Sequence, residues 1–360
     1  MKICFLANMN SIHSKKWIYY FLGKGHSISL ISIPTKDKIS LKDVYFIKEF
    51  KYKIFSIVTN IFYVKKIIQK ISPDIIHAHY GGVNGALAAL SGFHPFVLTV
   101  WGSDIMINPK KNLLIKLTTQ YILKKADLIT CDAEHIKKAI MDLGINSNKI
   151  KVIFFGVDTK KFFPSRKDEN LQKILDINTN FNVVISSRRL EPICDVETFI
   201  KAIPFVLKNF SNTIFIVAGN GSQERELKNL ANNLGISEKI RFVGWVPEEA
   251  MPKYLNIADI YVSTSLSDGG LSGSTAEAMS CGLPAIITDF GNNRDWIKDG
   301  TGGFLIPLKN PEVLAKKISC LIENKDLRIK FGENNRKVIE EKNNYYKEME
   351  KMEEIYNSYV

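Results

Sequence analysis

The sequence predicts an α/β protein built from two parallel-sheet domains in tandem. Short apolar or β-branched runs alternate with amphipathic helical stretches along all 360 residues. Most of these runs are continuously apolar, as expected for parallel strands that helices cover on both faces. The pattern restarts near Asn182, after a polar stretch from Pro164 to Asn180 that we interpret as a linker. At roughly 150 residues per domain, the length also fits two domains.

The expected strands fall into two sets. The first set comprises residues 2–7, 27–33, 44–49, 75–80, 96–101, 128–132 and 151–156. The second set comprises residues 183–187, 213–219, 239–244, 260–265, 284–289 and 303–307. Helical patterns separate the strands, so the connections are crossovers and both sheets are Rossmann-like and doubly wound. We expect the two domains to face each other across a cleft, with ligands at the carboxyl ends of the strands.

The domain boundaries follow from the same pattern. We assign residues 1–165 to an N-terminal domain and residues 166–342 to a C-terminal domain. The charged tail, 343–360, carries aromatic residues near helical spacing, Tyr356 among them. We expect it to form a helix that packs back on the first domain. A helix that merely covers a core is the alternative.

Two stretches that resemble membrane segments are better explained otherwise. The apolar run after Met1-Lys2 is too short for the core of a signal peptide and is expected to be the first strand. Residues 75–103 lack Asp, Glu, Lys and Arg, but Gly81-Gly82 and His94-Pro95 would break a spanning helix. The five cysteines lie far apart without a C-x-x-C pair, which disfavours a disulfide framework and favours the cytoplasm.

The positive charge is concentrated in the first half. The net charge is +12, yet residues 1–165 hold 24 basic and 10 acidic residues, whereas the remainder holds 25 and 27. Such a field attracts polyanions or an anionic membrane surface, although lysine-rich composition can also serve solubility. Residues 51–71 repeat apolar side chains at helical spacing between lysines. They form either a membrane-binding amphipathic helix, consistent with peripheral contact on the inner face of a membrane, or a helix covering the sheet.

The densest chemical motif runs from Ser263 to Pro284 (STSLSDGGLSGSTAEAMSCGLP). A strand ends, a glycine-containing loop follows, and a helix begins with exposed amides of the kind that cradle phosphates. Asp268 and Glu277 could accept hydrogen bonds from sugar or ribose hydroxyls; a turn residue and a surface helix residue are the alternatives. Asn220 is either a ligand contact or only a tight-turn residue. The candidate ligand-binding residues in this motif are Gly269, Gly270, Leu271, Ser272, Gly273, Ser274, Thr275 and Glu277.

Further polar candidates follow the strands of the first domain. Asn10 and His13 come after the first strand, and Asp104 follows the fifth. His77 and His79 lie two residues apart on an expected strand, so strand alternation places both on one face. His79, which is nearer the strand end, is the better candidate for a ligand contact, and a hydrogen-bonded structural role is the alternative.

The motif at 263–284 resembles the retaining glycosyltransferases of family 4, which have the two-domain GT-B fold. Other segments agree with this resemblance along essentially the whole chain: PDIIHAHY at 73–80, TVWGSD at 99–104, IKVIFFGVDTKKFFP at 150–164, VAGNG at 217–221 and FVGWVP at 242–247. The resemblance implies transfer of a sugar, with retention, from a nucleotide-sugar donor in the second domain to an acceptor in the first. It also implies that no metal or other cofactor is needed, and the sequence accordingly contains no D-x-D pair.

The resemblance assigns roles residue by residue. Glu277 matches the acid that holds the ribose, and Asp268 stands near the acid that touches the transferred sugar. The amides of Gly270–Ser274 would hold the pyrophosphate, and Arg189 or Arg188 would stabilise the departing diphosphate. In the first domain, the acceptor candidates are Asn10, His13, His79, Trp101 and Asp104.

Three departures from the family pattern stand out. Asp268 and Glu277 are nine positions apart, where the family has eight. Cys194 stands where the family has a lysine, and Trp101 stands where many members have histidine before GSD. Each change removes or moves a polar group that the family presents to a ligand.

The basic first domain favours a lipid-linked or cell-surface glycan as acceptor. A nucleotide-sugar 2-epimerase on the same scaffold and a non-enzymatic polyanion-binding protein are the alternatives. A dinucleotide-dependent oxidoreductase is disfavoured, because no G-x-G-x-x-G follows the first strand. No nucleic-acid-binding module is present either, so a nucleic-acid partner is not expected.

Overall fold

The computed structural model describes residues 1–34, 41–267 and 271–360, and the chain divides into two compact units. The first unit comprises Met1–Phe155 and Tyr346–Val360, and the second comprises Gly156–Tyr345. The division therefore lies at Phe155, not at the expected residue 165. Residues after Phe155 belong to the second unit because Val157 and Phe162 are buried in its core.

The first unit is a seven-stranded parallel sheet with the order β3-β2-β1-β4-β5-β6-β7. Leu6 of β1 pairs with Ile31 of β2 on one side and with Ala78 of β4 on the other. The strands are β1 (Lys2–Leu6), β2 (Ser27–Ser32), β3 (Asp43–Phe46), β4 (Ile75–His79), β5 (Phe96–Thr99), β6 (Leu128–Cys131) and β7 (Ile150–Val152). Each strand expected in this half is present, and β4 and β5 are buried throughout, as their continuous apolar runs predict.

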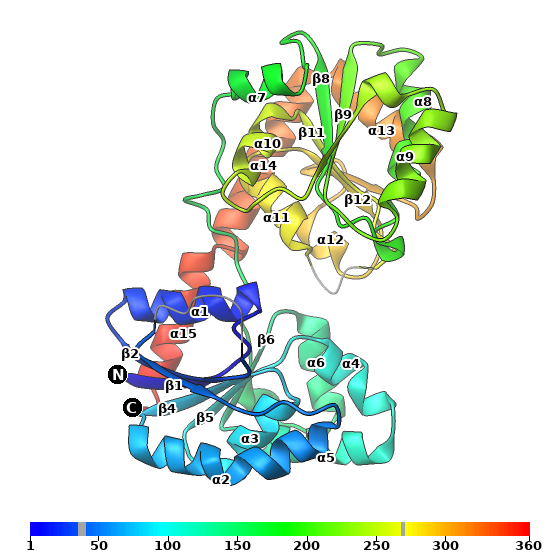
Figure 1. Ribbon diagram of the computed structural model, residues 1–360. Helices are drawn as coiled ribbons and strands as arrows, with labels where there is room; N and C mark the ends of the chain where they lie inside the picture. Colours follow the sequence, from blue (N-terminus) through cyan, green and yellow to red (C-terminus); the bar gives the residue numbers. More distant parts are fainter. Residues whose placement is uncertain (35–40, 268–270) are drawn as a thin grey trace. The chain divides into compact units, whose positions relative to one another are not determined.

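Helices cover both faces of this sheet, with α2, α3 and α5 on one face and α1 and α15 on the other (Figure 1). The helices are α1 (Ile12–Gly23), α2 (Lys53–Ile71), α3 (Val83–Ser91), α4 (Ser103–Met106), η1 (Asn108–Lys110), α5 (Leu113–Lys125), α6 (Glu134–Asp142), η2 (Ser147–Lys149) and α15 (Tyr345–Asn357). Residues 75–103 fold as the expected strand–helix–strand. Within the described residues, no helix combines the length and apolarity that crossing a bilayer requires.

The second unit is a six-stranded parallel sheet with the order β10-β9-β8-β11-β12-β13. Its strands are β8 (Asn182–Ser186), β9 (Thr213–Ala218), β10 (Ile240–Gly244), β11 (Ile260–Ser263), β12 (Ala285–Thr288) and β13 (Gly303–Ile306). Its helices are α7 (Glu169–Ile174), η3 (Pro192–Cys194), α8 (Val196–Leu207), α9 (Glu224–Asn233), η4 (Ser237–Lys239), α10 (Met251–Ile257), α11 (Gly273–Ser280), α12 (Asn293–Trp296), α13 (Pro311–Glu323) and α14 (Lys325–Lys342). Two apolar clusters form the core of this unit.

Helix α2 has two apolar faces, which the sequence alone did not separate. Val64 and Ile68 pack into the core beneath the sheet, but Phe62 is 74% exposed on the opposite side. Its neighbours Ile54 and Val58 are exposed as well. The helix therefore covers the sheet and also presents an apolar surface to solvent.

Both sheets reverse their strand order beside their first strands, between β1 and β4 and between β8 and β11. In open parallel sheets, connections leave these two neighbours in opposite directions, and a crevice opens at their carboxyl ends. The segments at these positions begin at Ala7 and Tyr80 in the first unit and at Ser187 and Thr264 in the second. Most of the candidate residues that the sequence indicated lie in these segments, whereas Trp101 and Asp104 follow β5 and Asn220 follows β9.

Candidate functional site

In the second unit, Arg188 connects the end of β8 to the start of α11. Its Nη2 donates to Ser265 Oγ at 2.7 Å, and its Nη1 donates to Ser274 Oγ at 3.2 Å. Tyr261, buried on β11, also donates from its hydroxyl to Ser274 Oγ at 3.0 Å. Arg188 thereby holds the segment that begins α11 against the end of the sheet. Arg189, the next residue, is exposed and stands at the same edge, where an anion can reach it.

The start of α11 is capped by Ser272. Its side-chain oxygen accepts from the amide of Thr275 at 3.3 Å and lies 2.7 Å from Thr275 Oγ1. Gly273 is exposed at the first helical position, and an added Cβ there would meet no atom within 4 Å. The first turn thus presents backbone amides in an open position, with the positive end of the helix dipole behind them.

Glu277 is half-buried one turn into α11 and Leu271 is half-buried just before the helix, both on the segment that the sequence indicated. The remaining three candidates of this motif, Asp268, Gly269 and Gly270, lie outside the described residues.

Glycines let the loop after β9 pass directly against the loop after β8. A Cβ on Gly219 would lie 2.2 Å from the carbonyl oxygen of Arg188, and Gly219 has a φ of +155°. A Cβ on Gly221 would lie 2.3 Å from the carbonyl oxygen of Leu190. Asn220, between the two glycines, is exposed, and its carbonyl accepts from the amide of Leu190 at 2.9 Å. The VAGNG motif therefore fixes the backbone that carries both arginines.

In the first unit, His77 and His79 point to the same side of β4, with ring centroids 4.6 Å apart. His77 is fully buried and bonded on both nitrogens, to Tyr356 of α15 and to Thr99 at 2.7 Å. His79 Nδ1 is bonded to Ser14 Oγ at 3.1 Å, whereas its Nε2 has no partner among the described residues. Burial lowers the pKa of His79 to about 3, so its imidazole is neutral. His77 is structural, and His79 has one unpartnered ring nitrogen on the side of the sheet that α1 covers.

Asp104 ties together the ends of β4 and β5. Its Oδ2 accepts from the amide of Gly81 at 2.7 Å, and its Oδ1 accepts from the amide of Trp101 at 3.0 Å. Burial raises the pKa of Asp104, and the same backbone amides act in the opposite direction. Both carboxylate oxygens are thus used by the protein itself, which makes Asp104 a residue that shapes the site.

The aromatic candidates form one cluster. His13 stacks on Phe155 with ring centroids 4.3 Å apart, and the Trp101 ring stands edge-on to His13 at 5.4 Å. The His79 ring lies 5.8 Å from the Trp101 ring, centroid to centroid. Asn10 is exposed in the turn after β1 and is not part of this cluster.

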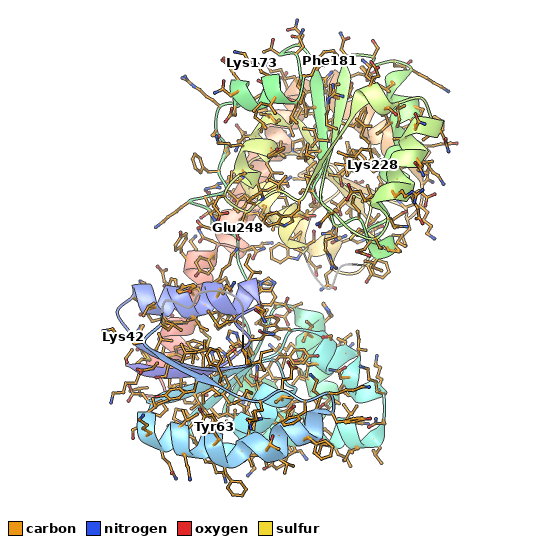
Figure 2. All side chains as sticks on the ribbon, in the orientation of Figure 1. Lys42, Tyr63, Lys173, Phe181, Lys228 and Glu248 are labelled. Atoms are coloured by element: carbon orange, nitrogen blue, oxygen red, sulfur yellow. The ribbon has the colours of Figure 1, made fainter. Side chains whose placement is uncertain are left out.

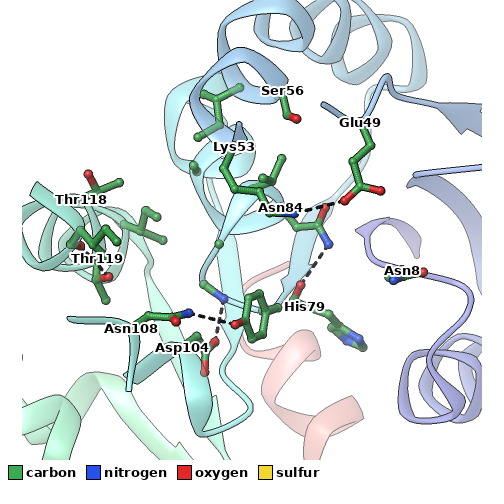
Figure 3. A pocket seen from close by; sticks show the side chains of 18 of the residues that line it. Asn8, Glu49, Lys53, Ser56, His79, Asn84, Asp104, Asn108, Thr118 and Thr119 are labelled. Carbon is green, nitrogen blue, oxygen red and sulfur yellow. Dashed lines mark hydrogen bonds and ion pairs between the residues drawn. The ribbon is translucent and has the colours of Figure 1, made fainter. Parts of the chain in front are cut away.

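A pocket of about 720 Å³ joins several of these residues (Figure 3). His79, Trp101 and Asp104 line it, and His13 and Asn10 do not. It also takes in residues that the sequence did not indicate as ligand contacts. These come from α1, the turn after β4, the segment around η1 and helices α2, α3 and α5, and include Ser14, Tyr80, Asn84, Asn108 and Lys111. Gly81-Gly82 was the available signal, since a glycine pair after a buried strand often marks close backbone approach.

Family models match both units. The model described as glycosyl transferases group 1 matches residues 167–338, and the model described as glycosyl transferase 4-like matches residues 2–133. The chain belongs to the group 1 glycosyltransferases.

Individual relatives agree with this assignment. An uncharacterized glycosyltransferase of Methanocaldococcus jannaschii is 30% identical over 68% of this chain and 62% of its own length. The UDP-Gal:alpha-D-GlcNAc-diphosphoundecaprenol alpha-1,3-galactosyltransferase of Escherichia coli is 28% identical over 81% of this chain and 77% of its own length. Among solved structures, HepE of Anabaena in complex with UDP has a TM-score of 0.83 at 18% identity, covering 99% of this chain and 100% of that one. The structural likeness shows the GT-B fold.

In this group 1 glycosyltransferase, Cys194 not only replaces the lysine of the family pattern but is also buried. Cys194 ends η3, is 3% exposed and packs into the core of the second unit. Its thiol therefore faces apolar side chains, and the position presents no cation to a ligand. Among the described residues, no group of three or more His, Cys, Asp or Glu side chains is placed to hold a metal ion.

Proposed function

We propose that this glycosyltransferase moves a sugar, with retention and without a metal ion, from a nucleotide-sugar donor to a lipid-linked or cell-surface glycan acceptor. The observation that carries the proposal is the arrangement of cationic and amide donors at one edge of the second sheet. Arg189 is exposed there, Arg188 braces the loop, and α11 begins with an open Gly273. An anionic ligand of diphosphate size suits such a set of donors.

The same arrangement suits the chemistry of transfer. When a glycosidic bond to a diphosphate breaks, negative charge accumulates on the leaving group and positive charge on the sugar. Fixed donors aimed at the leaving group stabilise that transition state without reorganising. We assign this role to Arg189 and the first amides of α11, and the contact with a ribose or sugar hydroxyl to Glu277, which is one turn further along the helix. HepE of Anabaena, which shares the fold, has been solved with UDP and with UDP-glucose.

The acceptor part of the proposal rests on the first unit. It carries the excess of lysine, and its pocket combines polar side chains at the strand ends, such as Asn8 and Asn84, with apolar walls from α2 and α5. The Escherichia coli relative is named for an acceptor in which a sugar is joined through a diphosphate to undecaprenol. An amphiphilic acceptor of that kind matches both features of the pocket.

We also infer peripheral contact with an anionic membrane through the outer face of α2 and α5. On α2, Phe55, Val58 and Phe62 are exposed, and so is Tyr63, which is labelled in Figure 2. On α5, Leu113 and Leu117 are exposed. Neither helix contains an acidic residue, and lysines flank the apolar side chains of both. Apolar groups between lysines are what an anionic lipid surface binds.

The donor site is tested by thermal stabilisation with UDP-, GDP-, ADP- and TDP-sugars in the presence of EDTA. A nucleotide sugar at about 100 times its Kd should raise the stability by roughly 2.7 kcal/mol. We expect one nucleotide class to stabilise the wild type and to stabilise Arg189→Met and Glu277→Ala much less. Arg225→Met, which removes another exposed arginine of the second unit, is the matched control and should respond like the wild type. If no nucleotide sugar stabilises the folded protein, the proposal fails.

Product analysis then separates transfer from the alternatives. With the stabilising donor and membrane extract as acceptor source, a transferase produces an α-linked product from an α-linked donor, and EDTA leaves the rate unchanged. An epimerised nucleotide sugar formed without an acceptor would instead establish the 2-epimerase. Loss of activity in EDTA that added Mg²⁺ restores would refute metal independence.

A further inference from the structure

Three asparagines line the pocket of the first unit at the ends of its strands, and each comes from a different element. Asn8 lies in the turn after β1, Asn84 is the second residue of α3, and Asn108 is the first residue of η1. All three are labelled in Figure 3. None of them is among the ligand-binding candidates that the sequence indicated.

Two of these side chains are held by their amide nitrogens. Asn84 Nδ2 donates to the carbonyl of His79 at 3.1 Å, and Asn108 Nδ2 donates to Tyr80 Oη at 2.9 Å. Within the described residues, no group donates a hydrogen bond to the Oδ1 atom of either asparagine. These two carbonyl oxygens can therefore accept hydrogen bonds from a ligand.

Asn8 is held by the opposite end of its amide. Its Oδ1 accepts from the backbone amide of Asn10 at 2.9 Å, as in an Asx turn, which leaves Nδ2 as the end that can donate to a ligand. Strand β1 pairs with β4, with Leu6 opposite Ala78, so the turn that carries Asn8 lies beside the turn that begins at Tyr80. The three asparagines thus offer two acceptors and one donor, none of them charged.

Tyr80 sets the spacing of the two acceptors. Asn84 is bonded to the carbonyl that precedes Tyr80, and Asn108 is bonded to the hydroxyl at the far end of the Tyr80 side chain. The two amides are therefore separated by about the length of one tyrosine side chain, which a pyranose ring with its hydroxyl groups can span. Tyr80 also has a φ of +76°, and its amide donates to the carbonyl of Thr99 at 2.8 Å. Strained backbone of this kind costs free energy and is concentrated at functional sites.

The charged residues of the lining do not favour an anion at the asparagines. Asp104 directs both oxygens to backbone amides, at 2.7 and 3.0 Å, and Glu49 is paired with Lys53 at 3.1 Å. Lys48 and Lys111 also line the pocket, but both are exposed, and a hydrated lysine contributes little to binding. An anion at the asparagines would meet two carbonyl oxygens, which repel it, whereas a hydroxyl group can donate to them.

We propose that this end of the pocket binds an uncharged sugar, whose hydroxyl groups donate to Asn84 Oδ1 and Asn108 Oδ1 and accept from Asn8 Nδ2. Each sugar hydroxyl is both a donor and an acceptor, so one sugar can satisfy all three amides. The inference rests on the proposed transfer to a glycan acceptor. It names an uncharged sugar as the part of that acceptor which the strand ends of the first unit hold.

The test is an NMR titration of the ¹⁵N-labelled full chain with the methyl glycosides of glucose, galactose, mannose and N-acetylglucosamine. The side-chain amide signals of Asn84 and Asn108, identified by their loss in the alanine variants, report on the atoms involved. We expect at least one glycoside to shift both signals saturably and inorganic phosphate to shift neither. Absence of a shift with every glycoside would overturn the inference, and so would a saturable shift of both signals by phosphate.

Substitutions of single asparagines locate the sugar. Asn84→Ala and Asn108→Ala each remove one acceptor and should weaken binding of the responding glycoside roughly fivefold, followed on the amide signal that each variant retains. Asn148→Ala, which removes an exposed asparagine of the first unit outside the pocket, is the matched control and should bind like the wild type.

A third substitution tests the donor without disturbing the fold. Asn8 is exposed, and serine in its place can still accept from the amide of Asn10, so Asn8→Ser should keep the Tm of the wild type. Because it lacks the Nδ2 donor, it should also bind the glycoside roughly fivefold more weakly. Wild-type affinity in all three pocket variants would refute the assignment.

This inference and the proposed function fail separately. If nucleotide sugars stabilise the protein and no methyl glycoside shifts the asparagine signals, only the sugar subsite is refuted. If a methyl glycoside binds at the asparagines and no nucleotide sugar binds, the sugar subsite stands and the transferase proposal falls.

Discussion

Replacing His79 by glutamine should make the first unit less sensitive to acid. In the wild type, burial holds the pKa of His79 at about 3, against about 6.5 for an unfolded histidine. The unfolded chain therefore binds a proton between these two values that the folded chain does not. The titration of His79 therefore leaves the free energy of unfolding at its full value above pH 6.5 and lowers it progressively as the pH falls towards 3.

The size of the effect follows from the two pKa values. Between pH 7 and pH 5, protonation of His79 in the unfolded chain costs the wild type about 2 kcal/mol of unfolding free energy. For a unit of this size, that corresponds to a loss of roughly 4–8 °C in Tm. His79→Gln lacks the titrating group and can keep a hydrogen bond to Ser14. Between pH 7 and pH 5, its Tm should therefore fall by roughly 4–8 °C less than the Tm of the wild type.

Calorimetry at pH 7, 6 and 5 measures the difference, with the transition of the first unit assigned by hydrogen exchange of peptides from β4. Asp132, whose pKa burial raises to about 6, and Asp104 titrate with the opposite sign, but both remain in the variant and cancel in the comparison. His77 also remains, and burial keeps its pKa low in both proteins. An equal loss of Tm in the two proteins between pH 7 and pH 5 would refute the reasoning.

Three further substitutions test contacts within the two units. Gly219→Ala places a Cβ against the carbonyl of Arg188 and should lower the free energy of unfolding, measured in urea, by at least about 2 kcal/mol. The control Gly235→Ala, at a glycine with positive φ but open space, should lower it by about 1 kcal/mol. Equal losses in the two variants would contradict the contact at Gly219. Asn335→Ala removes donors to the carbonyls of Leu283 and Gly302, at 2.8 and 2.6 Å, and should cost about 2 kcal/mol or more. An unchanged unfolding midpoint would argue against this pair of bonds. Tyr356→Phe leaves the buried His77 Nδ1 without its partner and should destabilise the first unit by about 1–3 kcal/mol, seen as faster hydrogen exchange in β4 and α15; unchanged exchange in both elements would count against it.

The sheets were predictable because parallel strands are covered on both sides. Runs such as Phe96–Thr99 and Ile260–Ser263 have to be apolar at every position, and this pattern does not depend on what the neighbouring strand is. The candidate segments were predictable for a related reason. Glycines and small hydroxyl residues at strand ends are required where the backbone approaches another loop, as at Gly219 and Gly221.

The face of a helix was not predictable where both faces are apolar. On α2, the spacing from Ile54 to Ile68 fits one broad stripe, and only the packing shows that Val64 faces the core and Phe62 faces solvent. The roles of Asp104 and Arg188 were hidden for another reason. Their partners, Gly81 and Ser265, are 23 and 77 positions away, so no local spacing reveals that these charged groups hold loops together.

The path of the chain imposes an order on folding during synthesis. The second unit is one continuous segment, 156–345, and can fold as soon as that segment has left the ribosome. The first unit cannot, because Met349, Met352 and Tyr356 are fully buried in it and are added after the whole of the second unit. Until then Phe21 and His77 lack the Tyr356 ring that contacts both of them. The domain that is translated first is therefore the one completed last, which reverses the usual order for a two-domain protein.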